Sequence, residues 1–290
     1  MLKIAILSGK GGTGKTMLSA ALADILPVKR IIADADVDAA NLSILLEAKD
    51  TTSKPYFGLP CAVIDPDLCT GCGICAEACR FNAIIPNGDV YTVRPIKCEG
   101  CNVCVYVCPA EAASLVMKEN GTLYLSQTPS GVLSHAELFA GSGTSGLLVT
   151  EVKKQAEANS EDSEVLIIDG PPGIGCPLIA TVSGVDLVII VAEPSLSSLH
   201  DIERLVTVCR QFNPVMTGVI NKYDLSPETT EQIEKWYRQE DISIIGKIPF
   251  DSEVLTSVRN CLPVTRQQSP ASDAIRAIAG KVKDYLDEHE

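Results

Sequence analysis

A glycine-rich segment near the N-terminus constrains the fold of this chain more than any other feature. The segment Gly9-Lys10-Gly11-Gly12-Thr13-Gly14-Lys15-Thr16 follows a short apolar run at residues 3–7 and opens an amphipathic stretch at residues 15–26. Such glycines let backbone N–H groups surround a phosphate, and the dipole of the following helix favours the bound negative charge. A lysine at the position of Lys15 reaches the β- and γ-phosphates, and the hydroxyl of Thr16 is suited to bind magnesium. These residues therefore predict a nucleotide site between a strand and a helix.

The rest of the chain alternates between strand-like and helix-like patterns. Short apolar runs predict buried strands at residues 30–33, 165–168, 187–192, 215–220 and 242–245. Amphipathic stretches predict helices at residues 147–159, 197–211 and 227–239. This alternation predicts an α/β protein with a doubly wound, mostly parallel sheet that binds ligands at the carboxyl ends of its strands. Asn120-Gly121, between apolar runs at 115–119 and 123–127, predicts a hairpin with a type I′ turn.

Cysteines interrupt this alternation between residues 61 and 118. Nine of the twelve cysteines lie between Cys61 and Cys108, and eight of them form two runs with the same spacing. The spacing is that of bacterial ferredoxins with two 4Fe–4S clusters, in which the fourth cysteine of each run ligates the other cluster. We therefore expect one cluster to be held by Cys69, Cys72, Cys75 and Cys108, and the other by Cys98, Cys101, Cys104 and Cys79.

Zinc binding and a purely structural role remain open as alternatives for these cysteines. Zinc ribbons also use Cys-x2-Cys pairs, although they do not need triplets, and clusters can serve as structural staples instead of electron carriers. The first run ends in Cys79-Arg80 where the ferredoxin pattern has Cys-Pro, which changes local charge and leaves the ligand in place. An insert this small, with few large apolar residues, is expected to depend on its metal for folding.

The charge balance limits the classes of partner. The chain has 37 acidic and 24 basic residues, a net charge of −13 and a pI near 4.7. Nucleic acid and anionic membranes both attract basic faces, so neither is expected as a partner. No apolar run is long enough to cross a bilayer and no signal peptide pattern opens the chain, so a cytoplasmic location is expected.

Two further segments bring carboxylates to the phosphate edge of the predicted sheet. Asp34-Ala35-Asp36-Val37-Asp38 follows the second strand, and Asp169-Gly170-Pro171-Pro172-Gly173 follows the third. Three carboxylates as close as those of the first segment repel one another unless a cation or proton lies among them. A strand that delivers one carboxylate to the phosphates is the Walker B arrangement, which puts Asp169 on the magnesium side. Gly170 and Gly173 can offer backbone N–H groups to a γ-phosphate.

The second lysine of the phosphate segment, Lys10, adds a resemblance. GKGGTGKT resembles the deviant Walker A motif of the MinD/ParA class, which includes the nitrogenase iron protein and Mrp-type ATPases. The resemblance implies a P-loop fold of the SIMIBI type and an ATP-dependent homodimer in which Lys10 reaches the partner's nucleotide. It also implies that Asp34 and Asp36 orient the attacking water and the magnesium-bound waters. Asp38 has a helix N-cap as its alternative role.

The segment that reads the base has two interpretations. Asn221-Lys222-Tyr223-Asp224 matches the guanine-reading pattern of GTPases. The MinD-class resemblance instead implies that Asn221 contacts adenine and that the backbone of Pro249-Phe250-Asp251 completes the pocket, with Lys222 beside it. We expect ATP because the phosphate segment carries more information than a four-residue pattern, and GTP is the alternative.

As a whole, the chain resembles MinD-superfamily ATPases that contain an inserted ferredoxin domain. The resemblance implies a discontinuous ATPase domain at residues 1–60 and 119–290, and a small α+β insert with two 4Fe–4S clusters at residues 61–118. The first function that it implies is Mg-ATP hydrolysis coupled, through dimer switching, to electron transfer toward an unknown redox partner.

Two alternative functions follow from the same resemblance. One is an Mrp-like carrier that passes iron–sulfur clusters or another metal to an acceptor protein, in which the cysteine after the Walker B segment, Cys176, has a role. The nitrogenase iron protein has a cysteine at that offset, but the second cysteine of its shared site has no counterpart near Gly141. The other, MinD- or ParA-like positioning, is least favoured, because the C-terminal helix ends in Asp287-Glu288-His289-Glu290 and suits the protein's own core better than a lipid surface.

Overall fold

The computed structural model describes residues 1–195 and 197–289. The chain divides into two compact units. The larger unit comprises Met1–Ser53, Leu123–Glu137 and Gly146–Glu290, and the smaller unit comprises Lys54–Thr122 and Leu138–Ser145. None of the helices in the described part of the chain is long and apolar enough to span a membrane.

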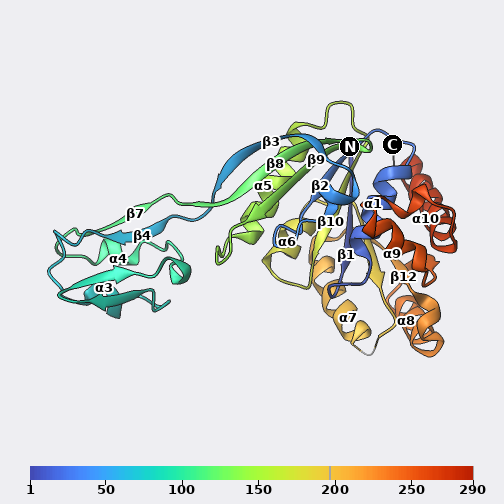
Figure 1. Cartoon of the computed structure of the whole chain (residues 1–290). Helices are drawn as coiled ribbons and strands as arrows, with labels where there is room; N and C mark the ends of the chain where they lie inside the picture. Colours follow the sequence, from blue (N-terminus) through green and yellow to red (C-terminus); the bar gives the residue numbers. More distant parts are fainter. Residues whose placement is uncertain (196, 290) are drawn as a thin grey trace. The chain divides into compact units, whose positions relative to one another are not determined.

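The larger unit is built on a nine-stranded sheet in the order β13-β12-β11-β1-β10-β2-β9-β8-β3 (Figure 1). The six neighbouring strand pairs from β13 to β9 are parallel. The strands are β1 (Leu2–Ser8), β2 (Arg30–Asp34), β3 (Lys49–Phe57), β8 (Glu119–Thr128), β9 (Gly131–Leu138), β10 (Val165–Pro172), β11 (Leu187–Ala192), β12 (Val215–Asn221) and β13 (Ser243–Ile248). The prediction of an α/β fold with a mostly parallel sheet is confirmed.

Helices cover both faces of this sheet (Figure 1). On one face, Ile4 and Ile6 of β1 share a buried core with Leu18 of α1 and with Ile275 and Ile278 of α10. A Cβ on Gly246 of β13 would lie 2.3 Å from Ile278, so glycine is what lets α10 pack this closely. The helices are α1 (Lys15–Ile25), α2 (Leu42–Leu45), α5 (Ser145–Ala158), α6 (Cys176–Val182), α7 (Ser198–Cys209), α8 (Pro227–Gln239), α9 (Ser252–Arg259) and α10 (Pro270–Glu288), with 3-10 turns at Arg210–Phe212, Tyr223–Leu225 and Val264–Arg266.

The C-terminal helix packs on the core, as its pattern predicts. Ile275, Ile278, Val282 and Leu286 of α10 are all buried in the same cluster as the strands. Cys209, at the end of α7, is also fully buried.

The predicted Asn120-Gly121 hairpin is wrong. Both residues lie inside β8, and the chain reverses instead between β8 and β9, where Gly131 has a φ of +127°. Asn120 is held from two sides, because its side-chain Oδ1 accepts from Gly58 N at 3.0 Å and its carbonyl accepts from Phe139 N at 2.8 Å. Pairing with neighbours on both sides keeps this Asn-Gly extended, which outweighs its local preference for a turn.

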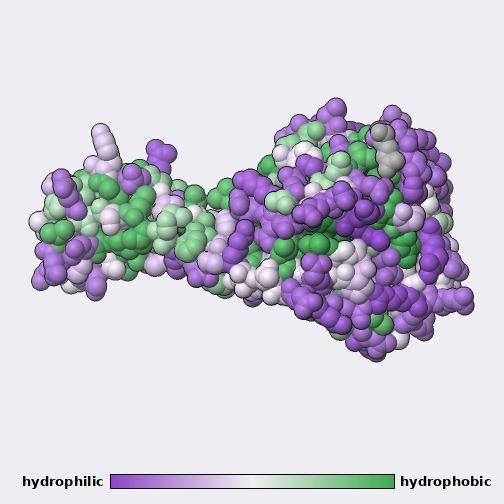
Figure 2. Space-filling view, turned by 90° about the horizontal axis from the view of Figure 1, so that it is seen from above, coloured by the Kyte–Doolittle hydropathy of each residue, from purple (hydrophilic) through white to green (hydrophobic). Residues whose placement is uncertain are grey.

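The smaller unit contains two short antiparallel pairs, β4 (Cys61–Ile64) with β7 (Ala113–Val116) and β5 (Ile84–Asn87) with β6 (Val90–Val93). Its helices are α3 (Ile74–Glu77) and α4 (Val103–Tyr106), with a 3-10 turn at Pro95–Lys97. Its buried apolar cluster consists of Ala62, Cys75, Ile84 and Cys104. Large apolar side chains such as Ile96 and Tyr106 are exposed instead, and Figure 2 shows apolar surface on this unit, at the left of the view. So small an apolar core provides little stabilisation by itself.

Candidate nucleotide site and cysteine cavities

The phosphate segment forms the turn between β1 and α1. Gly12 and Gly14 have φ values of +81° and +92°, which L side chains rarely adopt. A Cβ on Gly14 would lie 2.2 Å from Asn221 Nδ2, and one on Gly9 would lie 2.6 Å from the backbone of Asp201. The backbone angles at positions 12 and 14 and the close contacts at positions 9 and 14 therefore favour glycine there, whether or not a ligand is bound.

A buried ion pair lies directly under this loop. Lys15 Nζ is 3.0 Å from Asp169 Oδ1, and Ser19 Oγ donates to the same oxygen at 2.7 Å. Lys15 and Asp169 are only 6% and 1% exposed. Within the described part of the chain, Asp169 Oδ2 and Thr13 Oγ1 are buried without a hydrogen-bond partner. A buried oxygen without a hydrogen bond costs free energy. Asp169 Oδ2 and Thr13 Oγ1 therefore fit a site in which a magnesium ion, its waters and a phosphate supply the missing partners.

The carboxylates after β2 differ in their surroundings. Asp34 is fully buried, and its two oxygens accept from Asp36 N and Leu42 N, each at 3.1 Å. Burial, together with the neighbouring charge of Asp169, raises the pKa of Asp34 to about 7. Burial also raises the pKa of the half-buried Asp36. Asp38 is exposed and does not cap a helix, because the N-cap position of α2 is Asn41.

The segment after Asp169 continues beside the phosphate loop. β10 extends through Pro172, which lies opposite Ser8 of β1. A Cβ on Gly170 would lie 2.2 Å from Leu7 Cδ2, and Gly173 has a φ of +84°. Close packing on the Leu7 side chain therefore favours glycine at position 170, and the backbone angle favours it at position 173.

Asn221 and Lys222 contact the phosphate loop itself. Asn221 is 3% exposed, and its Nδ2 donates to Thr13 O at 2.7 Å. Lys222 Nζ donates to Gly12 O at 3.4 Å and pairs with Glu193 at 3.1 Å. In this structure the two side chains therefore brace the loop.

The two segments expected around the base lie next to each other. Asp224 Oδ1 accepts from Phe250 N at 2.7 Å. The carboxylate of Asp251 accepts from Glu253 N at 2.9 Å and from Ala271 N at 3.1 Å, so it caps α9 and ties it to α10. Pro249 and Phe250 precede this cap, and Phe250 is exposed. The structure thus brings 221–224 and 249–251 together.

Three contacts around the phosphate loop involve partner residues that no sequence motif predicts. Lys10 Nζ donates to Ser195 Oγ at 2.7 Å within the same chain. Ser195 and Glu193 both follow β11, so one short segment holds Lys10 and Lys222. Ser19, one turn into α1, orients Asp169. Only the three-dimensional arrangement relates these residues to the site.

The eight cysteines of the two runs surround two cavities of the smaller unit. One cavity, of about 10 Å³, is lined by Cys69, Cys72, Cys75 and Cys108. The other, of about 20 Å³, is lined by Cys79, Cys98, Cys101 and Cys104. All of these thiols are free. Among residues 1–195 and 197–289, no three His, Cys, Asp or Glu side chains converge in a way that suits one metal ion.

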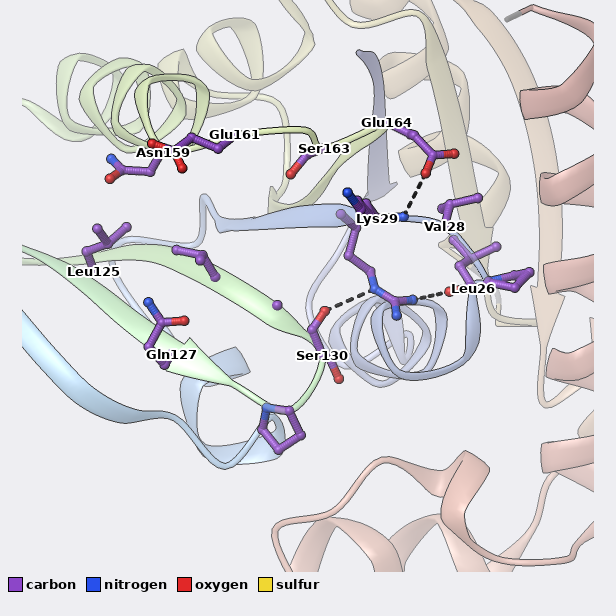
Figure 3. A pocket seen from close by; sticks show the side chains of 15 residues that line it. Leu26, Val28, Lys29, Leu125, Gln127, Ser130, Asn159, Glu161, Ser163 and Glu164 are labelled. Carbon is purple, nitrogen blue, oxygen red and sulfur yellow. Dashed lines mark hydrogen bonds between the residues drawn. The ribbon is translucent and has the colours of Figure 1, made fainter.

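A separate hollow of about 830 Å³ lies at the amino ends of the strands (Figure 3). Arg30 lines it and donates to Ser130 O at 3.0 Å and to Leu26 O, and Lys29 N donates to Glu164 at 3.2 Å. These bonds join elements of the larger unit. The predicted site residues do not line this hollow.

Comparison with known proteins identifies the family. The CobQ/CobB/MinD/ParA nucleotide binding domain family matches residues 4–264. Uncharacterized protein MJ0578 of Methanocaldococcus jannaschii is 34% identical over 99% of this chain and 98% of its own length. The iron-sulfur cluster carrier protein of Pyrococcus horikoshii is 25% identical over 99% of this chain and 87% of its own length. The structure of septum site-determining protein MinD from Pyrococcus horikoshii, complexed with Mg-ADP, has a TM-score of 0.61 at 19% identity and covers 98% of this chain and 96% of that one. The chain therefore belongs to the CobQ/CobB/MinD/ParA nucleotide-binding family and is a P-loop ATPase of the MinD/ParA type.

Proposed function

We propose that this ATPase couples Mg-ATP hydrolysis to electron transfer through two 4Fe–4S clusters held by residues 61–118. The observation that carries the proposal is that one chain combines a P-loop ATPase site with eight cysteines around two cavities. Bound clusters of this type accept and release single electrons.

In the proposed nucleotide site, the polar groups of the phosphate loop and of the neighbouring carboxylate segments each have a role. The backbone of Gly9–Thr16 binds the phosphates, and Lys15 exchanges its contact with Asp169 for the β- and γ-phosphates. The Thr16 hydroxyl and the unpaired Oδ2 of Asp169 hold magnesium with its waters, and Asp36 orients the waters. Asp34 holds the segment that carries Asp36.

Dimer formation gives Lys10 its role. Lys10 releases Ser195 and contacts the nucleotide of a second copy, so that ATP closes a homodimer and hydrolysis reopens it. Contacts to a γ-phosphate exist in only one of the two states, and this difference lets the nucleotide bias a conformation. The adenine pocket is assigned to 221–224 and 249–251.

The spacing of the cysteines supports clusters instead of single ions. A single zinc ion draws four thiolates to within bonding distance of one point, and no such convergence occurs among the described residues. A four-iron cubane is wider and holds its cysteines further apart. Cys69, Cys72, Cys75 and Cys108 are assigned to one cluster, and Cys98, Cys101, Cys104 and Cys79 to the other.

The test is anaerobic purification followed by metal analysis and EPR spectroscopy. We expect about eight iron and eight sulfide per chain, and a change of reduction potential or electron-transfer rate when Mg-ATP is added. Cys101→Ser should alter one cluster, whereas the exposed Cys261→Ser, in the larger unit, should alter neither. Zinc at these cysteines, or potentials and rates that ignore nucleotide, would refute the proposal.

A second function is favoured by one relative. The iron-sulfur cluster carrier protein of Pyrococcus horikoshii suggests that this chain delivers clusters to an acceptor. Cys176 is exposed at the start of α6, directly after the Walker B segment, where a transferable cluster could be ligated. This function requires iron to leave the protein during ATP turnover, and Cys176→Ser should stop the transfer. Iron that stays bound throughout turnover argues for electron transfer instead.

A further inference from the structure

A serine outside the phosphate motif contacts the Walker B carboxylate. Ser19 lies one helical turn after Lys15 on α1, and its side chain is fully buried. Ser19 Oγ lies 2.7 Å from Asp169 Oδ1 and 3.1 Å from Lys15 O. Asp169 is buried as well, so bulk water does not compete for this contact. The proposed function assigns no role to Ser19.

The hydroxyl proton of Ser19 goes to the carboxylate. A serine has one O–H proton, so it can donate fully to only one of the two neighbouring oxygens. An O–H···O⁻ bond is about twice as strong as a neutral one and is typically about 2.5–2.7 Å long. The distance of 2.7 Å to Asp169 Oδ1 falls in this range, whereas the carbonyl of Lys15 is neutral and lies further away at 3.1 Å.

The two oxygens of Asp169 have different surroundings. Oδ1 accepts from two donors, Lys15 Nζ at 3.0 Å and Ser19 Oγ at 2.7 Å. Oδ2 is buried and has no hydrogen-bond partner among residues 1–195 and 197–289. In the proposed nucleotide site Lys15 turns to the phosphates, and Oδ1 then keeps only Ser19. The oxygen of Ser19 is one rotatable bond from the backbone of a packed helix, so it stays in place when the long lysine side chain moves.

An arrangement of this kind controls how well a carboxylate binds a metal. Carboxylates that ligate metals are themselves hydrogen-bonded, and these outer partners fix the orientation of the ligand. Removing such a partner typically costs about ten- to a hundredfold in metal affinity. Ser19 holds Oδ1 of Asp169 and leaves Oδ2 available to magnesium with its waters.

We infer that Ser19 is a positioning residue for magnesium, which keeps Asp169 in its metal-binding orientation after Lys15 has moved to the phosphates. This inference rests on the nucleotide part of the proposed function, which assigns Lys15 to the phosphates and Asp169 to magnesium. Ser19 acts on the metal through Asp169 and leaves the binding of the nucleotide without metal to the loop.

The test is isothermal titration calorimetry of the full-length protein with ADP, first in EDTA and then at increasing MgCl2. Ser19→Ala should bind metal-free ADP as the wild type does, and should need about ten- to a hundredfold more magnesium to reach the Mg-ADP state. In ATP hydrolysis the same variant should have a raised half-saturating magnesium concentration, and its rate should recover when magnesium is saturating.

Two further variants calibrate the measurement. Ser272→Ala is the matched control, because Ser272 is also fully buried on a helix, α10, and its hydroxyl has no hydrogen-bond partner among the described residues. This variant should bind ADP and magnesium as the wild type does. Thr16→Ala removes a hydroxyl assigned to magnesium, so it should weaken magnesium binding directly.

The outcomes separate the inference from the function on which it rests. Wild-type magnesium dependence in Ser19→Ala, together with a loss in Thr16→Ala, overturns the inference and leaves the magnesium assignment standing. Equal weakening of metal-free ADP binding in Ser19→Ala also overturns it, since Ser19 would then support the loop as a whole. The same holds if Ser272→Ala weakens magnesium binding as much. Wild-type magnesium affinity in Thr16→Ala overturns the magnesium assignment of the proposed function and the inference with it.

Discussion

A buried lysine on α5 provides a direct test of how the larger unit is stabilised. Lys153 is 7% exposed, and its Nζ donates to three carbonyl oxygens at the end of α6: Ala180 at 2.9 Å, Thr181 at 2.8 Å and Ser183 at 2.6 Å. The C-terminal carbonyls of a helix lack partners within the helix, and a cation there also favours the helix dipole. Lys153→Met keeps most of the side chain's volume and removes all three bonds.

The expected loss follows from which carbonyls water can reach. Thr181 is fully buried, so its carbonyl becomes an unpaired acceptor, whereas Ala180 and Ser183 are partly exposed and can bind water. One unpaired buried carbonyl costs about 1–3 kcal/mol. Relief from burying an ammonium group offsets part of this cost. We therefore expect Lys153→Met to lower the free energy of unfolding by an amount near the lower end of about 1–3 kcal/mol.

The assay is urea unfolding followed by the fluorescence of Trp236, the only tryptophan, which lies on α8 of the larger unit. The neighbouring Lys154 is 64% exposed and pairs with Glu151 at 2.9 Å, so Lys154→Met is a matched control with an expected loss of about 0–1 kcal/mol. Equal midpoints for the two variants would refute the assignment of Lys153 as a brace for α6.

The pH dependence of the stability difference between the wild type and Lys153→Met gives an independent check. Burial lowers the pKa of Lys153 to about 8. Between that pH and the ordinary lysine value near 10.4 the unfolded chain holds more protons than the folded one. The wild type should therefore gain stability relative to Lys153→Met as pH rises from about 8 to about 10.

Three further outcomes are expected. Gly170→Ala should lower the free energy of unfolding by about 1–3 kcal/mol, because its Cβ meets Leu7 at 2.2 Å; Gly175→Ala, whose Cβ meets only a side-chain atom at 3.5 Å, should not, and urea midpoints compare them. Asp169→Asn should abolish Mg-dependent ATP hydrolysis while the protein stays folded, as phosphate release and circular dichroism would report; unchanged hydrolysis would contradict the magnesium assignment. Burial lowers the pKa of His135 to about 4, so the wild type should lose stability relative to His135→Gln as pH falls from about 6.5 to about 4, and parallel curves would contradict this.

Local pattern was sufficient for much of the larger unit. Apolar runs predicted β11 at Leu187–Ala192, and amphipathic spacing predicted α8 at Pro227–Gln239, with the bounds that the structure has. The glycine-rich segment predicted the turn between β1 and α1, because few other residues accept its backbone angles. The sequence patterns also singled out every cysteine that lines the two cavities.

Contacts between distant segments decided the rest. Asn120-Gly121 has the composition of a turn and lies in a strand, because its neighbours at Gly58 and Phe139 hold it there. Asn221 belongs to a base-reading pattern, yet its amide braces Thr13, 208 positions away. Ala62 lies outside both cysteine runs, yet its N–H donates to Cys98 Sγ, 36 positions away.

The amino-acid sequence by itself determined the alternation of strands and helices, the phosphate loop and the repeated cysteine pattern. These features depend on backbone freedom and on side-chain period, which are properties of a few consecutive residues. The tertiary structure alone decided which buried oxygens of the described residues lack partners and which lysine supports which helix. Such pairings bring together groups separated by tens to hundreds of residues, and no local pattern records which groups those will be.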